Sequence, residues 1–245
     1  SSDVCSSDLL LTLVHTPKHI RKIKRKCELG QEIAEVKTDT ESYNAACEVV
    51  ATAVEAAKKG NFAAIRPPGH HASREASKGF CFFNNIAIAA QYILNTEKRV
   101  CILDIDGHWG DGTEKIFYRD DRVLFFSIHQ NKSYRLKGNM DIKRGLTRNV
   151  SIPLNSGDDV LLNKIKNFLP EVEKFNPDCI GISAGFDGHG EDSLLSLSFT
   201  EKGYYEFGRL ISSLDKKVFG VLEGGYHENV VSCIESLVNG INYKN

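Results

Sequence analysis

The 245-residue sequence predicts a single-domain, three-layer α/β fold, a parallel β-sheet covered by helices on both faces. Three observations predict this class. Several short runs are apolar throughout, as strands buried on both faces are. Helical patterns separate these runs, which is the element order of a parallel sheet. Finally, 41% of the residues are apolar, enough for one sizeable core in a chain too short for two large domains.

The start of the chain predicts one helix. Thr16 and Pro17 have the form of an N-cap and a first helical residue, so we expect a helix from there to Gly30. The opening SSDVCSSDL repeats Ser-Ser-Asp and is more like translated adapter sequence than folded protein. We therefore expect residues 1–10 to be non-native or disordered and one domain to cover 11–245.

A second helix and a first strand should follow. Apolar residues recur at helical spacing through YNAACEVVATAVEAA, with a cap expected near Asp39 or Thr40 and an end at Gly60. The run FAAI at 62–65 predicts a strand that leads into the Pro/Gly loop RPPGHHA. The segment NNIAIAAQYIL at 84–94 predicts another helix.

Five later apolar runs predict buried strands, and two helical patterns lie among them. The strands are expected at 99–106, 122–129, 149–154, 178–186 and 217–225, and the helices around 157–173 and 200–213. The polar stretch 131–149 predicts a long surface loop, a kind of segment that is often functional.

Charge and cysteine content bear on partners and compartment. The 31 basic and 32 acidic residues nearly balance, which argues against direct binding to nucleic acid or to an anionic membrane. The 7 cysteines include no C-x-x-C pair, and no apolar run reaches the roughly 20 residues of a membrane span. We expect a soluble protein in the reducing cytoplasm. The sequence leaves the oligomeric state open.

Ionisable residues follow the predicted strands at the points where the strands end. Asp106 ends the run at 99–106 and His108 follows two residues later, and Asp187 directly follows the run at 178–186. Ligands of open parallel sheets bind outside the carboxyl ends of the strands. Two carboxylates and an imidazole can hold a divalent ion and leave positions open for water and substrate. We assign these three residues as ligands of Zn(II), with Fe(II) or Mn(II) as alternatives.

Each of these residues also has an ordinary structural explanation. A strand-end Asp commonly caps the next helix, a His commonly packs in a loop, and Tyr226 could pack over the preceding glycines. Beside a metal, His70 and His71 would instead act as general base and acid, and Tyr226 would stabilise an oxyanion. Capping alone does not explain why several strand ends carry such side chains.

Six sequence blocks carry a specific family resemblance. Within about residues 11–242 the chain contains, in this order, the blocks RPPGHHA, GFCFFNN, DIDGHWGDGT, SIHQ, SAGFDGH and EGGYH. They resemble the signature blocks of the arginase/deacetylase superfamily, in its branch of histone deacetylases and acetylpolyamine amidohydrolases. The Glu-Gly-Gly-Tyr form is more like class II and bacterial or archaeal members than class I.

The resemblance implies a sheet of about eight parallel strands and a role for each site residue. Asp104 would lie behind His70 and Asp111 behind His71, and Asp106, His108 and Asp187 would be the zinc ligands. The implied site comprises catalytic residues His70, His71, Asp104, Asp111 and Tyr226, channel residues Gly79, Phe80 and Gly225, and a structural potassium site at Asp104, Asp106, His108 and Ser127.

The implied activity is metal-dependent hydrolysis of an N-acetyl amide, which releases acetate and an amine. The substrate would be an acetylated lysine side chain, or an acetylated polyamine or other small amine. His71 would accept a proton from water and later donate one to the leaving amine, while His70 supports the developing charge.

The sequence departs from the family pattern at three places. Gly107 and Trp109 stand where the family usually has an apolar residue and a second histidine, which we expect to loosen this strand end. The stretch 131–149 lacks most of the usual Pro/Gly pattern. The strand and substrate-facing loop with which the family normally starts have no counterpart in the sequence, so one strand of the sheet is expected to be missing.

Two other functions fit parts of the pattern. An arginase-like hydrolase with two manganese ions would need a further aspartate where the sequence reads Asp187-Gly188-His189. A degenerate fold that binds acylated lysine without hydrolysing it would usually have lost a ligand, the histidine pair or the tyrosine, and all of these are present.

Overall fold

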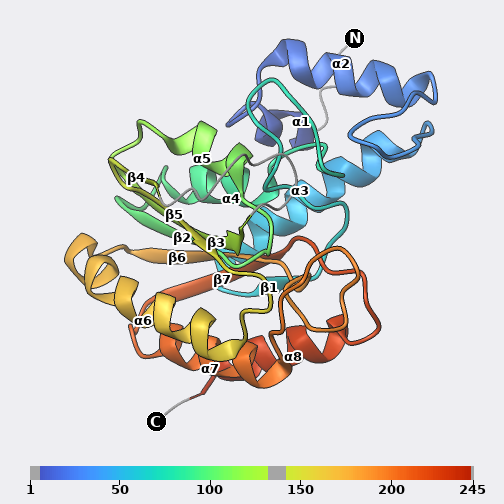
Figure 1. Ribbon diagram of the computed structural model, residues 1–245. Coiled ribbons are helices and arrows are strands. Elements are labelled where there is room, and N and C mark those ends of the chain that lie inside the picture. The colour runs from blue at the N-terminus through green and yellow to red at the C-terminus, as the bar shows by residue number, and fades with distance from the viewer. Residues whose placement is uncertain (1–5, 132–141, 244–245) are drawn as a thin grey trace.

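The computed structural model describes residues 6–131 and 142–243, which form three layers (Figure 1). The central sheet has seven strands in the order β1-β7-β6-β2-β3-β5-β4. All neighbouring strands are parallel except β4 (Ile142–Arg144), which pairs antiparallel with β5 (Thr147–Ile152). The parallel α/β class is confirmed. Within the described residues the sheet has seven strands rather than about eight, and six of them are parallel.

Every predicted apolar run forms a strand close to its expected position. The remaining strands are β1 (Phe62–Ala63), β2 (Val100–Asp104), β3 (Val123–Gln130), β6 (Cys179–Ala184) and β7 (Lys217–Leu222). Side chains alternate between the two faces of the sheet, so Ile102 enters one core and Cys101 and Leu103 enter the other. Both cores exclude water, which is why these strands are apolar at every position.

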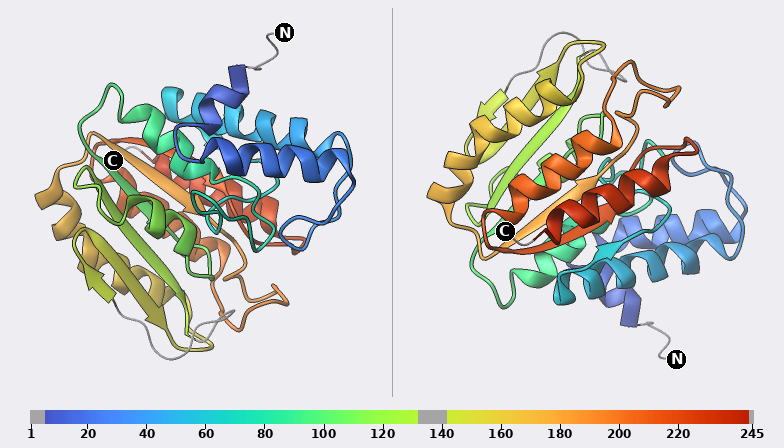
Figure 2. Two further views of the ribbon diagram at one scale, coloured as in Figure 1. Left: turned by 90° about the horizontal axis from the view of Figure 1, so that it is seen from above. Right: turned by 90° about the horizontal axis from the view of Figure 1, so that it is seen from below.

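Helices cover both faces of the sheet (Figures 1 and 2). One layer holds α1 (Ser6–Leu11), α2 (Pro17–Glu28), α3 (Ser42–Lys59), α4 (Asn85–Ile93) and α5 (Asp111–Phe117). The opposite layer holds α6 (Asp158–Phe175), α7 (Glu201–Ser212) and α8 (Val230–Ile241). None of the described helices combines the length and the apolar character needed to cross a membrane.

Three predicted helix ends are confirmed by their local geometry, whereas α3 has Glu41 as its N-cap rather than Asp39 or Thr40. The Thr16 side chain accepts a hydrogen bond from the backbone N–H of His19 at 3.3 Å at the start of α2. Asn84 caps α4 by accepting from the N–H of Ala87 at 3.0 Å. Gly60 ends α3 in the left-handed conformation (φ +71°) that glycine adopts most easily.

Four segments differ from the prediction. Helices α5 and α8 were not predicted. Helix α1 begins at Ser6, inside the segment 1–10 that we placed outside the fold, and the Leu11 side chain at its end is fully buried. The stretch 131–149 is not a loop throughout, because β4 and the start of β5 fall within it as an antiparallel pair. Residues 132–141 of this stretch and residues 1–5 lie outside the described residues.

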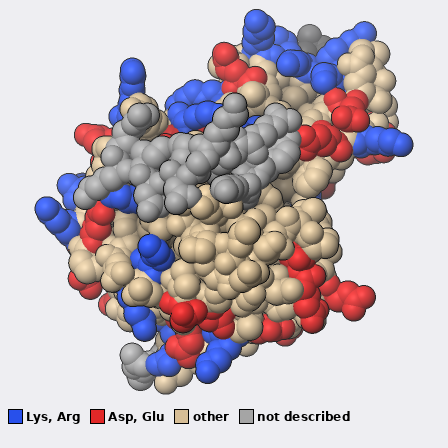
Figure 3. Space-filling view, viewed as in Figure 1, with Lys and Arg blue, Asp and Glu red and all other residues tan. Residues whose placement is uncertain are grey.

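The solvent-facing side of α2 is strongly basic, although the charges of the whole chain nearly balance. Its inward side buries Ile20, Ile23 and Cys27 against the core. Lys and Arg side chains gather over this helix at the top of the molecule (Figure 3). The exposed basic residues are Lys18, Arg21, Lys22, Lys24 and Arg25. The basic run is therefore the solvated face of an amphipathic helix.

Candidate active site

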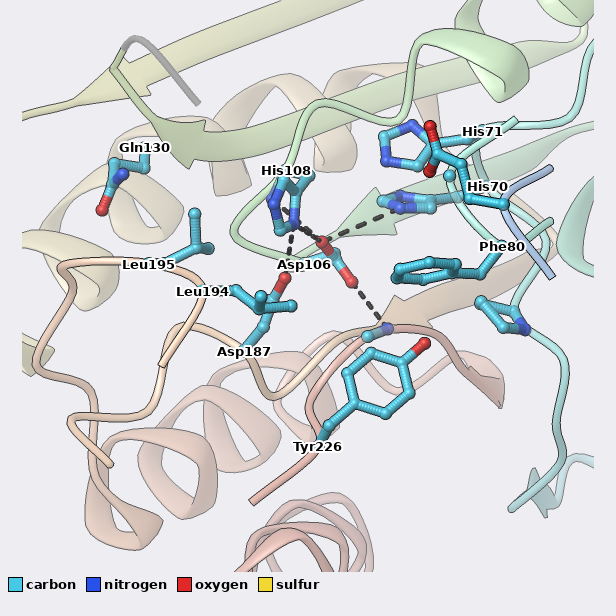
Figure 4. A pocket seen from close by; sticks show the side chains of 14 residues that line it. His70, His71, Phe80, Asp106, His108, Gln130, Asp187, Leu194, Leu195 and Tyr226 are labelled. Carbon is cyan, nitrogen blue, oxygen red and sulfur yellow. Dashed lines mark hydrogen bonds and ion pairs between the residues drawn. The ribbon is translucent and has the colours of Figure 1, made fainter. Parts of the chain in front are cut away.

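A cavity of about 390 Å³ opens at the carboxyl ends of β2 and β6 (Figure 4). Strand β2 lies between β3 and β6, so the chain winds outward to one side after β2 and to the other side after β6. A crevice at such a switch point is where ligands bind in this class of sheet. The cavity is lined by residues from six segments of the chain, among them His70, Phe80, His108, Asp187, Leu195 and Tyr226.

Asp106, His108 and Asp187 converge at the floor of this cavity. Asp106 and His108 follow β2, and Asp187 follows β6. The Nδ1 atom of His108 lies 2.6 Å from Oδ2 of Asp187 and 3.2 Å from Oδ1 of Asp106. The three ligand atoms all lie within 4.8 Å of one another. The structure therefore brings the three predicted metal ligands together, each with one ligand atom facing the other two.

The backbone holds the remaining carboxylate oxygens in place. Oδ2 of Asp106 accepts from the N–H of Gly224 at 2.7 Å, and Oδ1 of Asp187 accepts from the N–H of Gly107 at 2.7 Å. The N–H of His108 donates to Oδ1 of Asp106 at 2.9 Å. These bonds fix the direction in which each carboxylate presents its other lone pairs, as partners of metal ligands do.

The chemistry of this donor set fits a divalent ion. Atoms bound to one tetrahedral zinc ion lie roughly 3.3 Å apart, close to the spacing seen here. Both carboxylates are 1% exposed, and burial together with the neighbouring Asp106 raises the pKa of Asp187. Two buried carboxylates this close need positive charge beside them, which a divalent ion would supply.

A second group of possible ligands, His189, Glu201 and Cys233, has a simpler explanation. The Nε2 atom of His189 lies 3.4 Å from Oε2 of Glu201. Its Nδ1 atom accepts the N–H of Glu191 at 3.2 Å, so the proton of a neutral ring lies on Nε2 and points at Glu201. That tautomer offers no lone pair to a metal. His189 therefore forms a hydrogen-bonded pair with Glu201. It stands where an arginase-like site with two metal ions would need a further aspartate.

His70 lies beside the three ligands and against a buried carboxylate. Its Nδ1 atom lies 3.0 Å from Oδ2 of Asp104, and its Nε2 atom lies 3.7 Å from Oδ1 of Asp106. Burial by itself lowers the pKa of His70, but Asp106 and Asp104 outweigh it and hold that pKa well above its usual value. Burial raises the pKa of Asp104 to about 7, against the opposite effect of His70.

His71 has the opposite electrostatic environment. Burial and the adjacent His70 lower the pKa of His71 to about 4, although Asp111 opposes them. The Nδ1 atom of His71 donates to Oδ1 of Asp111 at 3.1 Å, and Lys78 and Lys115 lie 2.6 and 2.7 Å from the other oxygen. The two rings lie 4.1 Å apart. Their environments thus favour a charged imidazole at His70 and a neutral one at His71, whose Nε2 atom keeps a lone pair.

Phe80 and Tyr226 form facing walls near the mouth of the cavity. Their ring centroids lie 6.0 Å apart at nearly a right angle, and Phe80 is 36% exposed. Gly79 and Phe80 both have positive φ values of +54° and +65°, and a Cβ at position 79 would collide with the His71 ring. The N–H of Phe80 donates to the carbonyl of Ala34 at 3.0 Å, which holds this turn against the neighbouring loop.

The glycine that lines the cavity near Tyr226 is Gly224, whereas we had expected Gly225. Gly225 has a φ of +98°, and a Cβ there would meet the backbone of Phe186 at 2.9 Å. Its function is therefore to let the chain turn back toward the cavity, where Tyr226 follows. Gly79 lines the cavity as expected.

The four residues expected at the potassium site come from strand β3, from the end of the neighbouring strand β2 and from the segment that follows β2. Asp104 in β2 is the register partner of Ser127 in β3, and both side chains are fully buried. Asp106 and His108 follow two and four positions later. Their placement is compatible with the predicted cation, and the potassium site stays a prediction.

The unusual residues around the ligands do not loosen the strand end. Three successive backbone N–H groups, those of residues 106, 107 and 108, donate to the carboxylates of Asp104, Asp187 and Asp106. The Leu195 side chain occupies the space that a side chain at Gly107 would enter. The Trp109 ring stacks on His129 with the centroids 6.2 Å apart. The expected loosening at this position was wrong.

Sequence reasoning missed one buried carboxylate, Glu223. It is fully buried, and its Oε2 atom accepts from the N–H groups of Gly69 and His70 at 2.6 and 3.0 Å. The Ser183 hydroxyl donates to its other oxygen at 2.8 Å. An acidic residue at the end of an otherwise apolar strand was a signal that could have found it.

Fold and site together define an α/β protein with a candidate mononuclear metal centre, flanked by two carboxylate-backed histidines and a tyrosine. Residues 4–241 match the histone deacetylase domain family. Because this match covers nearly the whole chain, the protein belongs to the histone deacetylase family.

Individual relatives agree with this membership. The chain is 36% identical over 233 residues to a probable deacetylase of Archaeoglobus fulgidus, and the match covers 87% of this chain and 65% of the relative. The chain therefore spans slightly less than two thirds of that protein. It resembles the crystal structure of the HDA15 HD domain with a TM-score of 0.86 at 30% identity, over 94% of this chain and 72% of that one. It also resembles the crystal structure of the acetylpolyamine aminohydrolase of Burkholderia pseudomallei, with a TM-score of 0.80 at 28% identity. This match covers 95% of this chain and 82% of that one.

Proposed function

We propose that this protein hydrolyses N-acetyl amides and releases acetate and a free amine. The observation that carries the proposal is the convergence of Asp106, His108 and Asp187 beside two histidines that are each backed by a carboxylate. Relatives with the names deacetylase and acetylpolyamine aminohydrolase support the same reaction.

Asp106, His108 and Asp187 would hold the metal ion in this reaction. A bound divalent ion would supply activated water and polarise the acetyl carbonyl. We propose Zn(II) because a site with two carboxylates and an imidazole suits it, and Fe(II) or Mn(II) could be held by the same atoms.

His71 is the proton carrier in this proposal. Its lowered pKa keeps the ring neutral at pH 7, and its Nδ1–H bond to Asp111 leaves the Nε2 lone pair available. The ring can therefore accept a proton from the attacking water. The same atom then donates that proton to the nitrogen of the leaving amine.

His70 and Tyr226 would stabilise the negative charge that develops on the acetyl oxygen and on the attacking water. The Asp106 and Asp104 carboxylates raise the pKa of His70 and so favour its protonated form. Tyr226 lines the same cavity from the opposite side. Partial burial raises the pKa of Tyr226 to about 12, so its hydroxyl keeps its proton and can donate a hydrogen bond.

The cavity fits an aliphatic chain that ends in an acetyl group. Phe80, Leu194 and Leu195 give its walls an apolar character, and Asp106, His108 and Asp187 lie at its floor (Figure 4). We propose that the substrate is an acetylated lysine side chain or an acetylated polyamine or small amine, which would place its methylene groups between these walls.

Acetate release from an acetyl-lysine peptide and from an acetylpolyamine tests the proposal. Metal-free protein would be reloaded in turn with Zn(II), Fe(II) and Mn(II), beside an Asp187→Ala variant. We expect metal-dependent release that is lost in the variant, and the better substrate would identify the substrate class. Folded, metal-loaded protein that releases no acetate from either substrate would refute the proposed hydrolysis.

A further inference from the structure

Arg66 contacts the loop that carries Tyr226 at three places. Its two terminal nitrogens donate to the backbone carbonyls of Glu223 and Gly225, the second at 2.5 Å. Its guanidinium carbon also lies 4.4 Å from the centroid of the Tyr226 ring. Arg66 precedes the histidine pair in the sequence block RPPGHHA, to which the proposed reaction gives no function for the arginine.

The two carbonyls that Arg66 binds are on either side of Gly224. The N–H of Gly224 donates to Oδ2 of Asp106 at 2.7 Å, so the backbone that Arg66 holds also orients a proposed metal ligand. A planar guanidinium with several fixed donors can hold two carbonyls and a ring at once, which the single ammonium of lysine cannot.

The contact between the two loops is reciprocal. Arg66, from the loop before the histidine pair, binds the backbone of the loop that ends β7. Glu223 lies in the loop that follows β7, and its carboxylate accepts hydrogen bonds from the N–H groups of Gly69 and His70. Each loop thus fixes the backbone of the other with one charged side chain.

The Tyr226 side chain has few other restraints. It is 53% exposed, and the other ring contact described for it is the edge of Phe80. A half-exposed aromatic side chain can leave its rotamer at low cost unless a neighbour holds it. The Arg66 guanidinium supplies that neighbour through a cation–π contact of favourable geometry.

We propose that Arg66 is the positioning residue for Tyr226. It holds the Gly224–Tyr226 turn through two carbonyls and the phenol ring through its face, so that the hydroxyl stays directed at the reacting carbonyl. This inference rests on the proposed function for the step that Tyr226 assists. The positive charge also opposes the effect of burial on the pKa of Tyr226, which makes its hydroxyl a better hydrogen-bond donor.

A double-mutant cycle with Arg66→Met and Tyr226→Phe separates positioning from general stability. Arg66→Met should lower kcat by roughly 30- to 100-fold with KM changed less than about threefold, since a misplacement of about 1 Å can cost a factor of about 100. In the Tyr226→Phe background the same substitution should cost less than about threefold, because the phenol that it positions is gone and the N–H of Gly224 still donates to Asp106. Equal losses in both backgrounds would overturn the proposal.

Arg99→Met is the matched control. Arg99 also lies over an aromatic ring, that of Phe175 at 5.5 Å, and donates to the carbonyl of that residue at 2.8 Å, but near the opposite ends of the strands. The Arg99→Met substitution should leave kcat unchanged. Arg66→Lys keeps the charge and a single donor nitrogen, and it should retain a larger part of kcat than Arg66→Met. It provides a second variant if the methionine protein folds poorly.

A signal from Tyr226 itself tests the inference independently of turnover. With 3-fluorotyrosine at position 226, the ¹⁹F resonance should shift and broaden in Arg66→Met and stay in place in Arg99→Met. An unmoved resonance in folded Arg66→Met would refute the positioning function. If the wild-type protein releases no acetate but the resonance moves as expected, the proposed reaction fails while the contact between Arg66 and Tyr226 stands.

Discussion

At the scale of single residues, Tyr226 allows the sharpest test of the proposed reaction. Tyr226→Phe removes one hydroxyl from the cavity and leaves the ring and the three proposed ligands unchanged. We expect kcat to fall by about 100- to 1,000-fold, because the lost donor acts on charge that develops only in the transition state. Metal content, measured by elemental analysis, should equal that of the wild type. Unchanged turnover would exclude Tyr226 from the chemical step.

The residues of the site differ in how visible they are in the sequence. Asp106, His108 and Asp187 could be proposed from their positions at strand ends, because parallel strands bring their carboxyl ends to one edge. The partners Asp104 and Asp111 came from the family resemblance, and the structure puts them 3.0 and 3.1 Å from the histidines. Arg66 was not predicted, because it acts on backbone atoms of a distant loop, which a sequence pattern does not reveal. Glu223 was missed although its place at the end of an apolar strand is a signal in the sequence.

At the scale of secondary-structure elements, His15 connects the α1–α2 turn to the site. Its side chain is 2% exposed, and its Nε2 atom accepts the N–H of Asn84 at 2.9 Å. Asn84 caps α4, and its amide donates to the carbonyl of Ala72, next to the histidine pair. This contact requires the neutral form of His15, and burial lowers the pKa of His15 to about 3.

This contact predicts that acid destabilises the fold. Between an unfolded pKa of 6.5 and the folded value, the unfolded chain binds a proton that the folded chain excludes. Stability from this group is therefore complete above pH 6.5 and falls as the pH drops toward 3. The loss should be about 2 kcal/mol between about pH 7.5 and 5.0, measured by urea unfolding. His15→Gln keeps an acceptor without titrating and should remove this part of the pH dependence.

An exposed substitution on the following helix α2, Arg21→Gln, serves as the control and should keep the wild-type pH dependence. If His15→Gln and the wild type lose equal stability at low pH, His15 is not the titrating group.

The elements that the sequence predicted best are those with the strongest periodic signal. The continuous apolar runs of β2, β3, β6 and β7 and the capped helices α2, α3 and α4 were predicted because burial and capping depend on local residue types. Helix α5 was not predicted, because its 7 residues are too few to show a helical period. It begins shortly after the proposed ligand His108. Strand β4 forms through its pairing with β5, a tertiary contact that overrides a polar sequence.

At the scale of the whole molecule, the site depends on segments from the full length of the chain. The proposed ligands follow β2 and β6, the histidines come from the loop after β1, and the tyrosine comes from the loop after β7. Parallel strands that are adjacent in space bring these loops to one edge of the sheet. A metal ion held between two strand ends would therefore connect the two halves of the sheet, and metal binding should stabilise the entire fold.

Metal binding should raise the melting temperature in proportion to this stabilisation. At a free metal concentration about 100 times the Kd, a ligand that binds only the folded state adds about 2.7 kcal/mol. For a domain of this size that corresponds to a rise of roughly 5–10 °C, measured by thermal unfolding with and without Zn(II). Asp187→Asn should abolish the rise. His189→Gln should keep it, because His189 presents a proton rather than a lone pair to Glu201. A rise that disappears in His189→Gln and persists in Asp187→Asn would place the metal at the second group and refute the site proposed here.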